Sequence, residues 1–312
     1  MLNKYLPEGS LIGTYENREY IASIKGLERA RQEGKILEGI VKLCDSQTLT
    51  LHIDLNGIDG VIERCESVYS KEIKDIAVIT RVGKPVCFKV MQIKENEKGE
   101  PLAILSRKEA QRDAINNYLM DLIPGDIIPA RTTHFEPFGA FLDVGCGVNA
   151  LMAIDSISVS RITNPRDRFT LREELMVVVK SIDYDNERLC ASTKELFGTW
   201  EENAGAFSVG QTVYGIIRSV ENYGVFVELA PNLAGLAEVY EGAKVGQSCA
   251  VFIKSIIPEK MKIKLVIIDT YENEEKDSAM EHYFIDTKSV KHIDYWKYSP
   301  EGAQKIIETV FE

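Results

Sequence analysis

Residues 136–144 read Glu-Pro-Phe-Gly-Ala-Phe-Leu-Asp-Val, and residues 221–229 repeat the pattern as Glu-Asn-Tyr-Gly-Val-Phe-Val-Glu-Leu. In each stretch a glycine lies between two aromatic residues, within the apolar alternation that is typical of a β-strand. A glycine inside a strand allows a tight bend of the backbone. The pattern therefore predicts a strand that coils around a small barrel and holds two rings close together on its surface. Rings buried in the core are the alternative.

Three segments of the chain open in the same way. A turn glycine is followed five positions later by a small residue, as in Gly34 and Gly39, Gly125 and Ala130, and Gly210 and Gly215. Each segment continues as short strands rich in β-branched and aromatic residues, separated by turns. Closing five such strands into a barrel buries one face and removes the sheet edges. The predicted fold class is all-β, with tandem five-stranded barrels joined by short helices.

The repeats divide the chain into seven parts. We expect an N-terminal helical segment at 1–32, a first barrel at 33–108, a helical linker at 109–122, a second barrel at 123–195, a linker at 196–207, a shortened third barrel at 208–270 and an acidic, aromatic extension at 271–312. Within the extension, the sequence predicts a hairpin of Glu281–Asp286 with Lys291–Tyr298, followed by a helix that begins near Pro300. Its aromatic residues are expected to pack on the third barrel or on a partner.

Composition limits the classes of function. The 312 residues carry a net charge of −11, and residues 271–312 alone hold ten acidic and five basic residues. Tight, nonspecific binding to duplex DNA depends on neutralised phosphates and is therefore not expected. Stacking on single strands depends more on aromatic surface than on charge. Six dispersed cysteines, without a signal-like or membrane-spanning apolar run, predict a cytoplasmic protein.

The ordered set of motifs resembles the S1 RNA-binding domain of ribosomal protein S1 and related proteins. It comprises the entry glycine, the aromatic-Gly-small-aromatic strand, a downstream pair such as Gly235-Leu236, the stretch Val245-Gly246-Gln247 and a closing strand. The resemblance covers about two thirds of the chain and is weaker in the first repeat. It implies OB-fold barrels that bind single-stranded RNA on the surface of strands two and three.

The resemblance also implies which residues contact RNA. The candidates are the two ring pairs, the basic residue of the closing strand and the aspartate before its turn: Phe138, Phe141, Tyr223, Phe226, Arg188, Lys262 and Asp183. Two features depart from the family. A position that is often histidine is Ala153 in the second repeat and Glu238 in the third, where a carboxylate would repel phosphate. The third repeat is also shorter between its third and fourth strands.

The first repeat departs further. Counting along it from Gly39 puts Gln47 and Thr50 where the other repeats have rings, so no base stacking is expected there. N-terminal repeats of the resembled proteins attach to the ribosome. The resemblance therefore implies a protein-binding barrel, and a barrel that only supports the second repeat is the alternative.

Other constellations carry less weight. Asp54–Asp59 resembles the start of a calcium loop, but Cys65 stands where the loop needs glutamate, so a hairpin turn is predicted. The histidines lack metal-ligand spacing, and His134 is expected at the surface, either as an ordinary residue or beside the RNA face. Phosphate-cradling and nucleophile motifs are missing from the sequence. No cofactor, metal or enzymatic activity is expected.

The sequence therefore predicts a non-catalytic protein that binds single-stranded RNA through its S1-like repeats. The expected setting is translation, as a ribosomal protein S1 homologue or an S1-like factor, with the ribosome as a further partner of the first repeat and no membrane contact. A protein-interaction scaffold whose barrels have lost RNA affinity is one alternative. An accessory factor of RNA decay or transcription is another.

Overall fold

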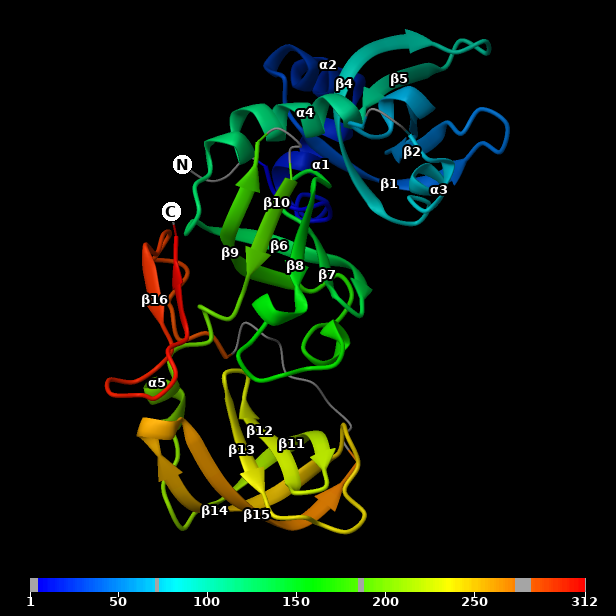
Figure 1. Cartoon of the computed structure of the whole chain (residues 1–312). Helices are drawn as coiled ribbons and strands as arrows, with labels where there is room; N and C mark the ends of the chain where they lie inside the picture. The colour runs from blue at the N-terminus through cyan, green and yellow to red at the C-terminus, as the bar shows by residue number, and fades with distance from the viewer. Residues whose placement is uncertain (1–4, 71–72, 185–187, 273–281, 312) are drawn as a thin grey trace. The chain divides into compact units, whose positions relative to one another are not determined.

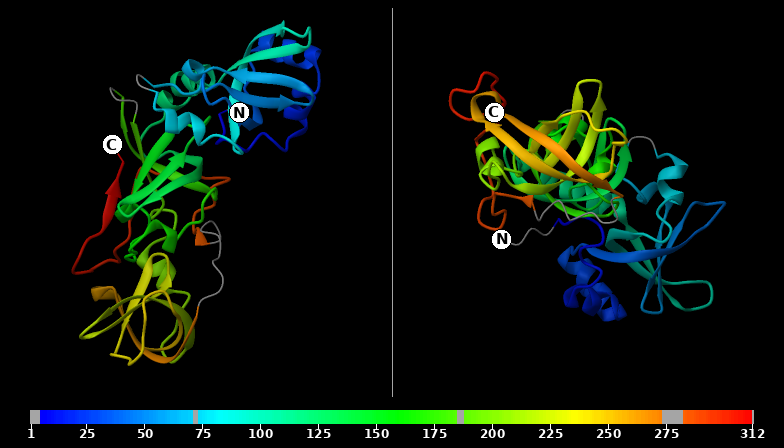
Figure 2. Two further views of the ribbon diagram at one scale, coloured as in Figure 1. Left: turned by 90° about the vertical axis from the view of Figure 1, so that its right-hand side faces the viewer. Right: turned by 90° about the horizontal axis from the view of Figure 1, so that it is seen from below.

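The computed structural model describes residues 5–70, 73–184, 188–272 and 282–311. It contains three closed barrels of five strands each (Figures 1 and 2), so the predicted all-β tandem fold is confirmed. We call them barrel one, barrel two and barrel three in chain order. Among the described residues, none of the helices is both long and apolar enough to cross a membrane.

The strands follow one another along the chain in groups of five. Barrel one consists of β1 (Leu37–Cys44), β2 (Leu51–Leu55), β3 (Ile58–Ile62), β4 (Pro85–Glu95) and β5 (Pro101–Ser106). Barrel two consists of β6 (Ile127–Glu136), β7 (Gly139–Asp143), β8 (Asn149–Ala153), β9 (Glu174–Asp183) and β10 (Arg188–Ser192). Barrel three consists of β11 (Thr212–Glu221), β12 (Gly224–Ala230), β13 (Leu233–Ala237), β14 (Ser248–Ile257) and β15 (Lys262–Tyr271).

Short helices lie before, between and within the barrels. The α-helices are α1 (Tyr15–Ile21), α2 (Ile24–Glu33), α3 (Asp75–Ile79), α4 (Arg107–Asn117) and α5 (Trp200–Ala204). Single 3₁₀ turns are η1 (Arg64–Glu66), η2 (Leu119–Asp121), η3 (Ile154–Ser156), η4 (Pro165–Asp167) and η5 (Pro258–Lys260). The N-terminal helical segment is interrupted at Ser23, whose side chain accepts a hydrogen bond from the Gly26 amide and so caps a new helix.

Each barrel closes by the same strand order. In barrel three, β11, β12 and β13 pair antiparallel, β15 runs parallel to β13, and β14 joins β15 back to β11. The repeated small residue has a steric role in this closure. A Cβ atom added at Gly215 would lie 2.4 Å from Val227 Cγ1, and one added at Gly39 would lie 2.4 Å from Ile53 Cγ2. Only glycine permits these strands to approach so closely.

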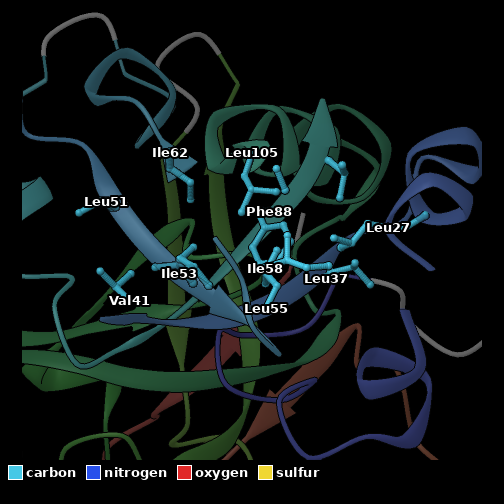
Figure 3. Close-up of a cluster of buried hydrophobic side chains, with 14 of the residues drawn as sticks. Leu27, Leu37, Val41, Leu51, Ile53, Leu55, Ile58, Ile62, Phe88 and Leu105 are labelled. Atoms are coloured by element: carbon cyan, nitrogen blue, oxygen red, sulfur yellow. The ribbon is translucent and has the colours of Figure 1, made fainter. Parts of the chain in front are cut away.

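The inner face of every barrel is apolar. Figure 3 shows the core of barrel one, where Phe88 of β4 and Leu105 of β5 lie among the inward side chains of β2 and β3. Leu27 of α2 belongs to the same cluster, so this helix covers part of the barrel. In barrel three, Trp200 of α5 belongs to the core cluster. Burying such side chains contributes about 1.5–3 kcal/mol each.

The contacts divide the chain into two compact units. Unit one comprises residues 1–122, 129–131 and 143–149, and unit two comprises residues 123–128, 132–142 and 150–312. In unit one, the fully buried Arg107 faces Glu8, with Nε 2.6 Å from Oε1 and Nη2 3.0 Å from Oε2. Burial acts to raise the pKa of Glu8, but the guanidinium charges of Arg107 and Arg81 outweigh it and lower that pKa.

The C-terminal extension differs from its predicted form. Strand β16 (Tyr295–Lys297) pairs with β17 (Glu308–Val310), and the described residues 282–311 contain no α-helix. The predicted hairpin is wrong because Tyr283 and Phe284 hydrogen-bond to backbone carbonyls at 176 and 196 instead of to a partner strand. The predicted helix is wrong because Gly302 adopts a φ of +75° in a turn after Pro300. Glu281 lies outside the described residues.

The extension packs on both barrels of unit two. Trp296 and Tyr298 are buried in the core cluster of barrel three, as expected for its aromatic residues. Farther upstream, His292 forms a bridge with Asp126 at the entry to barrel two, with Nδ1 2.8 Å from Oδ1. The hydrogen bond to Asp126, opposed by burial and aided by Asp294, raises the pKa of His292. The extension therefore ties the two barrels together.

The buried ion pair of unit one predicts a large effect of neutralising its acidic partner. Glu8→Gln removes the carboxylate that is hydrogen-bonded to the buried Arg107, so we expect the free energy of unfolding to fall by about 3–5 kcal/mol. Glu16→Gln is the matched control, because Glu16 forms an exposed pair with Lys35 whose loss is expected to cost only about 0–1 kcal/mol. Chemical denaturation of the full chain measures the free energy of unfolding of both variants. Equal losses in the two variants would contradict the assignment of Glu8 and Arg107 as a stabilising buried ion pair.

The bridge between His292 and Asp126 predicts a pH-dependent stability. Because the folded-state pKa of His292 is raised, its contribution is fully present below the unfolded value of about 6.5. The contribution is lost as the pH rises through the higher folded value. We expect the thermal midpoint to fall more between pH 6 and pH 9 in the wild type than in His292→Gln. Parallel pH profiles of the two proteins would refute this role.

Candidate nucleic-acid interface

The first ring pair lies at the turn between β6 and β7. Phe138 is 57% exposed in this turn, and Phe141 is half-buried on β7. Their ring centroids are 6.2 Å apart and their planes are nearly perpendicular. Because Ala140 and Leu142 alternate with Phe141 and point into the core, the second ring faces outward. The glycine between the rings is sterically required, since a Cβ at Gly139 would lie 2.4 Å from the Met152 carbonyl oxygen.

The second ring pair repeats this arrangement in barrel three. Tyr223 is 67% exposed and Phe226 is half-buried on β12, with centroids again 6.2 Å apart and planes perpendicular. A Cβ at Gly224 would meet the Ala237 carbonyl oxygen at 2.4 Å. In both barrels the glycine thus brings the ring strand close to its neighbour while the flanking rings stay at the surface. Exposed ring pairs of this kind are platforms on which bases can stack.

A row of outward side chains continues from the ring strand across barrel three. Phe226 lies opposite Ser219 on β11 and Leu236 on β13, and Leu236 lies opposite Lys264 on β15. Lys264 therefore completes a row that begins at the ring. It is not among the residues predicted from the sequence to contact RNA. The alternation along β15 could have found it, because Lys262 and Lys264 are both exposed while Ile263 is buried between them. Lys262 precedes Lys264 by two residues on the same face of β15 and lies opposite Ile257 of β14.

The closing strand of barrel two carries the other predicted polar residues. Arg188 is exposed and lies directly opposite Asp183, across the turn between β9 and β10. Two residues along β10, Cys190 lies opposite Leu151 of β8 and Ser181 of β9. In the strand order of the barrel, β8 separates β10 from the ring strand β7. Arg188 and Asp183 therefore lie together, two strands away from the rings.

Two polar side chains modify the immediate surroundings of the rings. The His134 ring lies 6.1 Å from the Phe141 ring, and its Nε2 is 2.6 Å from Glu136 Oε1. His134 is thus beside the ring pair and not elsewhere on the surface. In barrel three, Glu238 is 2.9 Å from the Lys254 ammonium group. The lysine compensates part of the charge with which Glu238 would repel a phosphate.

Barrel one presents a different row at the same place. Its paired residues, which correspond to the ring row of barrel three, are Leu43, His52, Val61 and Ile104. His52 therefore stands where barrel three has its second ring, and the count along the sequence that chose Thr50 is wrong. It fails because residues 45–50 form a longer turn, in which the Asp45 carboxylate accepts hydrogen bonds from the Gln47 and Thr48 amides. The His52 imidazole is 3.2 Å from the Asp59 carboxylate.

The chain is similar in sequence to known proteins over part of its length. Residues 121–194 match the family described as the S1 RNA binding domain. The chain is 31% identical over 220 residues to small ribosomal subunit protein bS1 of Staphylococcus aureus (strain COL), which covers 65% of this chain and 54% of that protein. The bS1 protein of Staphylococcus haemolyticus (strain JCSC1435) is 31% identical over 239 residues, or 70% of this chain and 59% of that protein.

The chain thus spans a little over half the length of the relatives it matches. Among solved structures, a multidomain protein with nucleic acid binding domains from Streptococcus pneumoniae aligns with 75% of this chain and 73% of its own, at 13% identity and a TM-score of 0.25. The family match covers barrel two, which carries the first ring pair. Residues 121–194 therefore belong to the S1 RNA-binding domain family, and the chain is a distant homologue of bacterial bS1 proteins over about two thirds of its length.

Proposed function

We propose that the chain binds single-stranded RNA through the ring pairs of barrels two and three and catalyses no reaction itself. The supporting observation is that one exposed, perpendicular ring pair with a centroid separation of 6.2 Å occurs twice at the same place in a barrel. Burial would stabilise such rings, yet both barrels leave the first ring of each pair exposed and the second only half-buried. Stacked bases would cover them without demanding a particular base sequence.

The proposed setting is cytoplasmic and translational, because the relatives are named as proteins of the small ribosomal subunit. Barrel one is proposed as the part that contacts protein, with the ribosome as its candidate partner. Its row has His52 in place of a phenylalanine ring, and Leu43 beside it is largely exposed. These features also suit a protein-interaction scaffold, which is the second candidate function.

The ring pairs predict a specific loss of RNA affinity. In the full chain, the double substitution Phe138→Ala/Phe141→Ala should weaken binding to a labelled single-stranded oligouridine by about 2–6 kcal/mol, at one stacked base per ring. Tyr223→Ala/Phe226→Ala should also weaken it. The thermal midpoint should change little, because the first ring of each pair is exposed and the second only half-buried.

Tyr15→Ala is the matched control, since it removes a strongly exposed ring from α1 of unit one. Its affinity should equal that of the wild type. If both double variants bind RNA as tightly as Tyr15→Ala does, the ring pairs are not the RNA-binding surface. If the wild type itself does not bind RNA, the scaffold function replaces RNA binding. Global unfolding of both double variants would instead assign the rings to the core.

The acidic character of the chain predicts a weak dependence of RNA affinity on salt. With a net charge of −11 and few cations beside the rings, we expect a log–log slope of about −1 to −3 between association constant and salt concentration. Titrations of the same oligouridine at several salt concentrations measure this slope. A much steeper slope would show that phosphate neutralisation, and not stacking, dominates the affinity.

A further inference from the structure

One row of outward side chains crosses barrel three at the second ring of its pair. Phe226 of β12 lies opposite Leu236 of β13, and Leu236 lies opposite Lys264 of β15. Neighbouring strands lie about 4.8 Å apart, so the backbone at Lys264 lies about 10 Å from the backbone at Phe226. Phe226 is half-buried, whereas Leu236 and Lys264 are exposed. The row therefore presents an aromatic face, an apolar side chain and a cation, one after the other.

Leu236 extends the apolar surface of the ring pair toward the lysine. A Cβ atom added at Gly224, between the two rings, would lie 3.0 Å from Leu236 Cδ1. A nucleotide whose base stacks on Phe226 must carry its sugar and phosphate past the edge of the ring, toward β11 or toward β13. Toward β11 the row holds the uncharged Ser219, and toward β13 it ends at Lys264. The cation is thus on the β13 side.

The ammonium group of Lys264 is available to an anion. Among the described residues, it has neither an ion-pair partner nor a hydrogen-bond partner. Glu238, which directly follows β13, is instead paired with Lys254 at 2.9 Å. Lys254 is therefore committed to a carboxylate, whereas Lys264 is not. A lysine ammonium group can bind a phosphate as a point charge, without a fixed geometry.

The lysine that was predicted from the sequence on this strand belongs to a different row. Lys262 precedes Lys264 by two residues, which corresponds to about 7 Å along β15. In the parallel register of β13 and β15 it falls beside Ala234, and Ala234 lies opposite Glu228. Glu228 is only 4% exposed. It is held by two guanidinium groups, those of Arg168 and Arg218. The row of Lys262 therefore begins at a buried carboxylate, whereas the row of Lys264 begins at a ring.

The charge at the end of the ring row is specific to barrel three. In barrel two, Cys190 lies opposite Leu151 in the same way as Lys264 lies opposite Leu236. In barrel one the corresponding residue is Ile104. Of the three rows, that of barrel three is the one that ends in a cation. A phosphate contact at this position would therefore distinguish barrel three from barrel two.

We propose that barrel three holds one nucleotide of a single strand along this row, with its base on Phe226 and its phosphate at the Lys264 ammonium group. Leu236 lies between the two and contacts the sugar. The proposal rests on the proposed function and adds to it a phosphate-binding residue and the course of the strand, from β12 across β13 to β15. Because strand register positions both ends of the row before RNA binds, ordering of the lysine side chain is the main entropic cost on the protein side.

The test measures binding of the full-length chain to a labelled oligouridine of about 24 nucleotides, long enough for two barrels. Lys264→Gln should lower the affinity about fivefold at 0.1 M salt and reduce the magnitude of the log–log salt slope by about 0.7, the share of one phosphate on a single strand. Lys264→Arg should keep most of both. Lys260→Gln, which removes an exposed lysine from η5 of the same barrel, is the matched control and should change neither.

Lys262→Gln tests the choice between the two lysines of β15. Its loss of affinity should be clearly smaller than that of Lys264→Gln, because its row does not contain the ring. A loss equal to or greater than that of Lys264→Gln would overturn the assignment. All these lysines are exposed, so each variant should keep the thermal midpoint of the wild type.

A double-mutant cycle separates this proposal from the proposed function. In the Tyr223→Ala/Phe226→Ala background no base stacks on the row, so Lys264→Gln should have little further effect. A full effect in that background would show that the lysine acts independently of the ring, which refutes the proposal. If the ring variants lose affinity but Lys264→Gln matches Lys260→Gln, the phosphate contact is refuted while RNA binding stands. If the wild type does not bind the oligouridine, the proposed function itself fails.

Discussion

The close approach of strands at a few glycines is the constraint on which the barrels depend. Where β11 passes β12, a single methyl group at Gly215 would collide with Val227, and the same holds at Gly39 in barrel one. Once five strands close into so narrow a barrel, the alternation of side chains along each strand determines which residues face outward. The rings at 141 and 226 are outside because their neighbours on each strand fill the core. The candidate RNA surface is thus a consequence of barrel closure.

The exposed rings and the predicted basic residues lie on different strands of barrels two and three. The rings lie on the second strand of each of these barrels and in the turn before it, whereas the predicted basic residues lie on the closing strand, with the third strand between them. Several cations near the surface are already paired, as Lys254 is with Glu238. Under the proposed function, an acidic protein of this design would gain RNA affinity chiefly from aromatic surface, with a few arginines and lysines guiding the backbone of the ligand.

Barrels two and three are held together by groups that water does not reach. The contacts within unit two include those of Glu228 with its two arginines, of the buried amide of Asn232 and of the aromatic residues of the C-terminal extension. Removing one member would leave a buried charge or donor unsatisfied, which costs more than the interaction gains. The extension, which has no counterpart among the repeats, therefore belongs to the scaffold that positions the ring pairs.

Local pattern was sufficient to predict the barrels, the ring pairs and the turn glycines, because strand alternation and glycine sterics act over a few residues. The spacing along the sequence did not predict His52 in the row of barrel one, because the turn after β1 is longer than in the other barrels. Lys264 was not predicted either, although the alternation along its strand indicates that it faces outward. The C-terminal strands and the contacts of Arg168 with Glu228 and Arg107 with Glu8 were beyond reach for another reason. The partners of the two ion pairs lie 60 and 99 residues apart in the sequence, and the form of the C-terminal segment depends on its contacts with barrels two and three. Only the packed structure brings such groups together, because burial and pairing are decided between segments and not within them.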